Sequence, residues 1–174
     1  MIEIIYVSQD GQTSKIAHYI QQYLTSNQIE ARVTDITHNV SYTLSPEVKH
    51  VVLGVPIRYG NPMSQAKAWL ANQDISDIEI SAFNVNLTAR KPEKSELSSC
   101  PYAHKFIKIL PEKVTHVAIF AGALDYAKYS WFDRKMIQFI MWITKGPTHS
   151  DSRIEYTQWP AVDKFSAELI SMRS

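Results

Sequence analysis

A short polar segment near the start of the chain has the residue types of an anion-binding loop. The hydroxyl side chains of Ser8 and Thr13 can donate hydrogen bonds, and Gly11 lets a ligand approach the backbone closely. Anions also bind well where a helix begins, because its first backbone N–H groups lack intrahelical partners and its dipole is positive there. The segment therefore predicts a phosphate monoester site made of Ser8, Gln9, Asp10, Gly11, Gln12 and Thr13.

The flanking residues place this segment between a strand and a helix. Residues 2–7 are mostly apolar and predict a strand buried on both faces. Asp10-Gly11 is also a hairpin signal, but the apolar residues that follow recur about every 3.6 residues, which favours a helix. They are Ile16, Ile20, Tyr23 and Leu24. A strand–loop–helix unit that binds no ligand remains an open alternative.

Two further predicted strand ends carry residues suited to a flat heterocycle. The first set is Arg58, Tyr59 and Gly60. The second set is Asn84, Val85, Asn86 and Leu87. An aromatic ring in the first set can stack on a planar ligand, and amides in the second can bond its edge. Together with a phosphate site they describe a mononucleotide such as FMN, although each set alone also fits a surface pair or ordinary strand-end residues.

Strands and helices alternate along the chain, which predicts an α/β fold with a doubly wound parallel sheet. The predicted strands are residues 2–7, 31–36, 50–55, 81–87 and 115–122. Helices are predicted after Thr13, from Pro62, near residues 102–110 and from about Pro160. In such sheets ligands bind beyond the carboxyl ends of the strands. We therefore expect the three polar loops to converge on one crevice.

Composition limits the classes of function. The 174 residues are expected to form one domain, 1–174, with a sizeable core. A net charge of +1 argues against nucleic acid as a partner. Cys100 is the only cysteine, which excludes an intrachain disulfide and cysteine-rich metal sites and fits a reducing cytosol. We expect no metal site, no catalytic triad, no leader and no membrane-spanning run.

The ordered set of motifs resembles the flavodoxin-like flavoproteins. It is more closely similar to one branch, the menaquinone-dependent protoporphyrinogen IX dehydrogenases of bacterial haem biosynthesis. The matching segments are residues 10–13, 57–60, 85–87, 89–94, 121–124, 131–141 and 156–157, with Trp159. The resemblance implies a flavodoxin-like five-stranded sheet and bound FMN, with the three residue sets above around the phosphate and ring. Ordinary flavodoxins have hydroxyl-rich phosphate loops, whereas this loop contains an acid, Asp10.

Residues 124–153 form an insertion in the last strand region that a minimal five-stranded fold does not need. Wound as a helix, it has a broad apolar side: Phe132, Met136, Phe139, Ile140 and Ile143. Trp131 and Trp142 lie near the polar side. Three interpretations compete: a core helix, a helix lying on a membrane surface, and a hydrophobic lid over a porphyrin or quinone site.

The resemblance also implies an activity and a location. Members of the branch oxidise protoporphyrinogen IX to protoporphyrin IX and pass electrons to menaquinone or ubiquinone at the cytoplasmic face of the inner membrane, as peripheral proteins. Arg58 is then the candidate catalytic residue. Substrate contacts are expected from Arg90, Lys91, Trp131, Phe132 and Met136. Two alternatives stay open, an FMN electron carrier without a metabolite substrate and a flavin-free membrane adaptor, and a homo-oligomer is also open.

Overall fold

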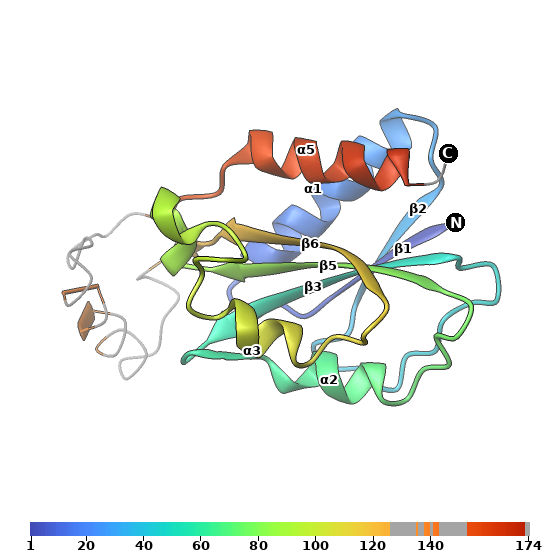
Figure 1. Ribbon diagram of the computed structural model, residues 1–174, viewed down its shortest axis with the longest axis horizontal. Coiled ribbons are helices and arrows are strands. Elements are labelled where there is room, and N and C mark those ends of the chain that lie inside the picture. Colours follow the sequence, from blue (N-terminus) through green and yellow to red (C-terminus); the bar gives the residue numbers. More distant parts are fainter. Residues whose placement is uncertain (126–134, 136–137, 140, 143–152, 173–174) are drawn as a thin grey trace.

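The computed structural model describes residues 1–125, 135, 138–139, 141–142 and 153–172, and its centre is a twisted sheet (Figure 1). The strand order is β2-β1-β3-β5-β6, and each of these neighbours pairs in parallel. The strands are β1 (Ile2–Tyr6), β2 (Ala31–Asp35), β3 (His50–Arg58), β5 (Glu79–Asn86) and β6 (Val114–Ala121). The predicted α/β fold with five parallel strands is confirmed.

Helices cover both faces of the sheet, as a doubly wound fold requires. α1 (Gln12–Ser26) and α5 (Trp159–Ser171) lie on one face, and α2 (Ser64–Leu70) and α3 (Ala103–Ile107) lie on the other (Figure 1). Two short 3₁₀ helices follow β5. They are η1 (Thr88–Arg90) and η2 (Pro92–Lys94).

The alternation of side chains along β1 explains why every residue of that strand is apolar or paired. Ile4 packs with Ile16 of α1 on one face, and its neighbour Ile5 packs with Trp69 of α2 on the other. All four side chains are fully buried. Because successive strand residues point to opposite faces, a strand covered on both sides is mostly apolar, and its one charged residue, Glu3, is buried with Arg32, Thr34 and Tyr42 as hydrogen-bond partners.

A tight reversal follows β3. The two-residue strand β4 (Asn61–Pro62) pairs antiparallel with the end of β3, with Ile57 opposite Pro62 and Arg58 opposite Asn61. The prediction that Pro62 begins a helix is wrong, because the chain first turns back along β3 and α2 begins only at Ser64.

The predicted insertion begins and ends at a small antiparallel ribbon. β7 (Ala123–Leu124) pairs with β8 (Ile154–Glu155). Within the inserted segment, Met141 is buried against Leu124, whereas Phe139 and Trp142 are 59% and 70% exposed. The predicted substrate residues Trp131, Phe132 and Met136 lie outside the described residues. In the described part of the chain, none of the helices combines the length and hydropathy needed to traverse a lipid bilayer.

Candidate functional site

A cleft opens at the carboxyl edge of the sheet, where the loops after β1, β3 and β5 meet. Its enclosed part has a volume of about 150 Å³, and the rest of the cleft is open to solvent. Its lining comes from the three predicted loops and, in addition, from Tyr102 and from Gly122 and Ala123 at the end of β6. The polar loops therefore converge as the sequence predicts.

The loop between β1 and α1 is held in shape by hydroxyl groups. The Gly11 backbone N–H donates to Ser8 Oγ (3.2 Å), and the Ser8 N–H donates to Thr37 Oγ1 on the loop after β2 (2.9 Å). Gln9, Asp10 and Thr13 line the cleft, whereas Ser8 and Gly11 are not among its lining residues. Ser8 therefore shapes the predicted phosphate loop. Thr37 was not predicted to take part.

Gln12 lines the cleft, but its side chain is 5% exposed and directed into the fold. Its Nε2 donates to Thr157 Oγ1 (2.9 Å), and that hydroxyl donates to the Ala121 carbonyl (2.7 Å). Arg153 Nη2 donates to Gln12 Oε1. The first turn of α1 is thus tied to the last residue of the insertion, Arg153, and to Thr157 beyond it. The sequence did not predict this contact.

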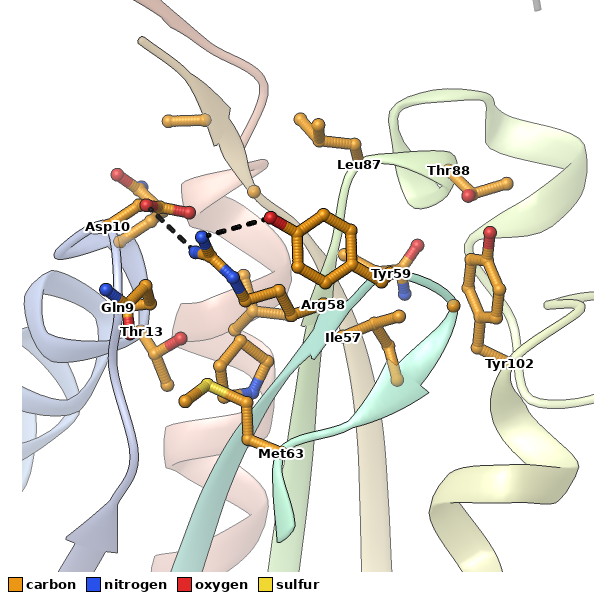
Figure 2. Close-up of a pocket in the computed structure, with 17 residues that line it drawn as sticks. Gln9, Asp10, Thr13, Ile57, Arg58, Tyr59, Met63, Leu87, Thr88 and Tyr102 are labelled. Carbon is orange, nitrogen blue, oxygen red and sulfur yellow. Dashed lines mark hydrogen bonds and ion pairs between the residues drawn. The ribbon is translucent and has the colours of Figure 1, made fainter. Parts of the chain in front are cut away.

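Arg58 reaches across the cleft to the first loop (Figure 2). Its Nη1 lies 3.5 Å from Asp10 Oδ1, with the two side chains 28% and 42% exposed. Its Nη2 donates to Tyr59 Oη (3.5 Å), and the guanidinium carbon lies 5.1 Å from the centre of the Tyr59 ring. The pair gives Asp10 a positive neighbour, so the acid does not face an anion site uncompensated.

Two tyrosines form the aromatic part of the cleft. Tyr59 is half exposed, and Figure 2 shows it and Tyr102 on either side of Ile57. Tyr59 and Gly60 both have positive φ, +49° and +75°, as a two-residue hairpin turn of type I′ requires. A Cβ on Gly60 would lie 3.7 Å from Tyr102 Cε1. Tyr59 was predicted, but Tyr102 was missed because it lies far along the chain, just before α3.

The amide side chains near the end of β5 are engaged inside the fold. Asn84 is fully buried, and its Nδ2 donates to the Val55 carbonyl (2.9 Å). Asn86 Nδ2 donates to Asn84 Oδ1 (2.8 Å), and Asn86 Oδ1 accepts from the Ala89 N–H (2.9 Å). Val85, Asn86 and Leu87 line the cleft, but Asn84 does not. Asn84 thus supports the site from beneath and does not face the ligand space.

The predicted substrate cations lie next to the cleft and outside its lining. Arg90 is at the end of η1, where its Nη1 donates to the Leu87 carbonyl (2.9 Å). Lys91 follows it and is partly buried. Thr88, two residues before Arg90, does line the cleft. Among the residues that the structure describes, no cluster of His, Cys, Asp and Glu could hold a metal ion.

Comparison with known proteins assigns the family. The flavodoxin domain family matches residues 3–151. Protoporphyrinogen IX dehydrogenase (quinone) from Escherichia coli strain K12 is 33% identical over 168 residues, which are 95% of this chain and 92% of that protein. The protein of that name from Leishmania major is 35% identical over 172 residues, 97% of this chain and 74% of that protein. This chain belongs to the flavodoxin family, in its protoporphyrinogen IX dehydrogenase branch.

The assignment confirms the predicted fold and the predicted cofactor. Flavodoxin domains bind FMN, so this flavodoxin-family chain is an FMN-type oxidoreductase. Flavodoxin 2 from Bacillus cereus shares the fold with a TM-score of 0.56 at 16% identity, covering 99% of this chain and 97% of that one. The flavodoxin of Streptococcus pneumoniae TIGR4 has a TM-score of 0.53 at 14% identity and covers 98% of each chain.

The described residues fit both ends of FMN. No described side chain caps the N-terminus of α1, so an anion can accept from its first-turn N–H groups. No described atom beyond its chain neighbours lies within 4 Å of a Cβ built on Gly11, which leaves room at that position. Arg58 supplies a cation, and Tyr59 supplies a ring face. The donor set is therefore suited to a phosphate next to a planar ring.

Proposed function

We propose that this flavoprotein oxidises protoporphyrinogen IX to protoporphyrin IX and passes the electrons to a quinone, menaquinone or ubiquinone, as a step of haem biosynthesis. Hydrogen leaves the macrocycle in successive pairs, and each pair of electrons and protons converts one quinone to a quinol. The observation that carries the proposal is the match to a dehydrogenase of that name over nearly the full length of both chains.

Binding of the cofactor is the first task of the chain's own residues. FMN, when bound, supplies the redox chemistry, which no protein side chain can supply alone. We infer that the α1 N-terminus with Gln9 and Thr13 holds the phosphate, while Arg58 offsets the charge of Asp10 and supplies a cation between phosphate and ring. Tyr59 and Tyr102 provide apolar surface beside the ring. Among the described residues of the lining, Arg58 is the cation that can touch the substrate as well as the cofactor.

Substrate binding requires apolar surface together with cations, because protoporphyrinogen is a large macrocycle with carboxylate side chains. Ile57, Met63 and Leu87 give the cleft an apolar lining. Arg90 and Lys91 lie directly beyond Thr88, at the rim next to Leu87, and we infer that they receive the propionates.

We further propose that the insertion contacts the membrane surface at the cytoplasmic face of the inner membrane, where a lipid-soluble quinone is available. The exposed rings of Phe139 and Trp142 lie 6.3 Å apart, and Lys135 is exposed on the same segment. Aromatic and basic residues together are typical of segments that lie at the headgroup level. Cosedimentation with vesicles of phosphatidylethanolamine and phosphatidylglycerol tests this. A Phe139→Ser/Trp142→Ser variant should remain in the supernatant.

The decisive experiment for the activity is anaerobic turnover of protoporphyrinogen IX by purified, FMN-loaded protein with a menaquinone analogue as acceptor. The expected result is the red fluorescence of protoporphyrin, with stoichiometric loss of the oxidised quinone. A yellow protein that accepts electrons from dithionite but forms no porphyrin would instead be an electron carrier. A colourless protein that takes up no FMN would contradict the proposal at its first step.

A further inference from the structure

A lysine on α3 contacts the turn that carries Tyr59. Lys105 Nζ donates to the Gly60 carbonyl (2.8 Å) and to Asn61 Oδ1 (3.0 Å). Asn61 Nδ2 in turn donates to the Tyr59 carbonyl (3.2 Å). One ammonium group therefore fixes, directly or through Asn61, three consecutive residues of the turn between β3 and β4.

This turn needs such support. Tyr59 has φ +49°, in the left-handed region that bulky side chains rarely adopt. β4 is only two residues long, so few ladder hydrogen bonds hold the turn against β3. The turn is also at the surface, with Tyr59 half exposed. A turn that is strained, exposed and paired over only two residues keeps one conformation only where other contacts hold it.

We propose that Lys105 is a positioning residue for the cofactor site: it fixes the Tyr59–Gly60 turn so that the Tyr59 ring stays beside the cleft. The inference rests on the proposed function, because it takes FMN as the ligand of that cleft. Lys105 acts without touching the cofactor. It orders the turn before binding, so that the entropy of ordering Tyr59 is not lost when FMN enters.

The contact also gives α3 two roles at one place. Tyr102, directly before α3, lines the cleft, and Lys105, one turn later, donates to the carbonyl of Gly60, the residue that follows Tyr59. The spacing between the two tyrosines is then set by one rigid element. Lys108 directly follows the same helix and is exposed. Its ammonium group makes no hydrogen bond or ion pair with any described residue.

The test compares Lys105→Met with Lys108→Met, which removes the same charge from the residue directly after the same helix. FMN is titrated into apoprotein of each variant, and the fluorescence of bound FMN is recorded, since a stacked tyrosine quenches it. We expect Lys105→Met to weaken FMN binding about three- to tenfold, because only the ordering of the turn, and no contact with FMN itself, is lost, and to brighten the bound flavin. Lys108→Met should match the wild type in both measurements, and Lys105→Arg should recover most of the affinity.

A double-mutant cycle with Tyr59→Ala separates positioning from a general loss of stability. If Lys105 acts through Tyr59, Lys105→Met should add little to the Tyr59→Ala loss. Wild-type affinity and fluorescence in Lys105→Met, or full additivity in the cycle, would overturn the inference while the proposed function stood. A wild-type protein unable to bind FMN would remove both together. Thermal unfolding of each apoprotein shows whether the variants are folded.

Discussion

Two arginine–carboxylate pairs in this molecule have the same chemistry and opposite surroundings. The Glu3 side chain is fully buried and accepts from Arg32 Nε (3.2 Å) and Nη2 (2.9 Å), from Thr34 Oγ1 (2.6 Å) and from Tyr42 Oη (2.7 Å). Asp10 is 42% exposed and meets Arg58 at 3.5 Å on the edge of the cleft. The first carboxylate is enclosed by donors and serves the fold. The second pair is open to an incoming anion.

The two edges of the sheet show the same contrast. At the amino edge, His50 Nε2 lies 2.8 Å from Ser81 Oγ, and His50 Nδ1 lies 3.8 Å from Glu79 Oε2. The order of groups is that of a catalytic triad, but Ser81 is fully buried. A substrate cannot reach it. Exposure next to open space, rather than residue type, therefore distinguishes the functional edge of this protein from the structural one.

Replacing Glu3 should have the largest effect on stability and almost none on the cofactor. Glu3→Ala leaves the hydroxyls of Thr34 and Tyr42 and the Arg32 guanidinium without their common acceptor, so we expect a loss of about 3 kcal/mol in the free energy of unfolding. Urea unfolding of the apoprotein measures it, and the FMN dissociation constant should stay within about twofold of the wild type. Thr34→Val, which removes one donor, should cost only about 1 kcal/mol. A folded Glu3→Ala protein that no longer bound FMN would break the comparison.

Replacing Arg58 should have the opposite pattern: a large loss of FMN binding and a small loss of stability. Arg58→Ala removes a cation from the cleft and leaves Asp10 near the phosphate site, so FMN binding or turnover should fall at least about tenfold. The cost in stability should stay below about 1 kcal/mol, because the ion pair is partly exposed. Arg58→Lys keeps the charge but loses the planar guanidinium, so its FMN affinity should lie between those of the wild type and Arg58→Ala. Asp10→Asn in the Arg58→Ala background should restore part of the FMN affinity. Unchanged flavin content and kinetics in Arg58→Ala would remove that residue from the site.

The sequence was sufficient to predict the sheet and most of the residues that line the cleft. Alternating strand and helix patterns predicted the five parallel strands, and Arg58 and Tyr59 were found because they directly follow a strand whose end must face the crevice. The predicted strand, residues 81–87, already contained Asn84, but its amide was expected to face the ligand. In the fold Asn84 lies two residues inside β5, where its amide donates to the Val55 carbonyl of the neighbouring strand.

The residues that were missed depend on tertiary contacts that no local pattern records. Tyr102 reaches the cleft only because α3 packs beside β4, and Thr157 reaches Gln12 only because the chain returns to α1 after the insertion. Pro62 fits both a helix start and a short edge strand, and the positive φ values at Tyr59 and Gly60 decided between them. Local propensity fixes the elements, whereas the pairing of distant loops decides which side chains share a site.

Removing the buried hydroxyl at the amino edge should have a modest effect, confined to stability. Ser81→Ala deletes the hydrogen bond to His50, and we expect a loss of about 1 kcal/mol in the free energy of unfolding. Protoporphyrinogen turnover should equal that of the wild type. Anaerobic assays and urea unfolding on the same FMN-loaded preparation check both statements. A stable Ser81→Ala protein without activity would show that Ser81, His50 and Glu79 take part in the reaction even though Ser81 and His50 are buried.

A third acid, Glu155, lies between the two extremes and should give the smallest effect. Its side chain is 24% exposed, and it accepts from Lys15 Nζ (2.6 Å) and from Trp159 Nε1 (2.9 Å). Burial by itself raises the pKa of Glu155, but the hydrogen bond and charge of Lys15, with Trp159 and Arg153, outweigh it and hold the pKa below the ordinary value of 4.5. A lowered pKa in the folded state means that the ionised group stabilises the fold above pH 4.5 and that this stability is lost as the pH falls through the folded pKa.

Glu155→Gln should therefore unfold at lower urea than the wild type at neutral pH, and the difference should close as the pH falls below 4.5. Glu93→Gln, which removes an exposed acidic charge on η2 that has no contact with Lys15, is the matched control for the change in net charge. Urea midpoints of FMN-loaded protein across this pH range measure both. A Glu155→Gln gap that is the same at every pH would mean that packing, not the ionised contact with Lys15, accounts for the role of Glu155. The degree to which an acid is exposed would then not predict how much its charge contributes to the stability of this protein.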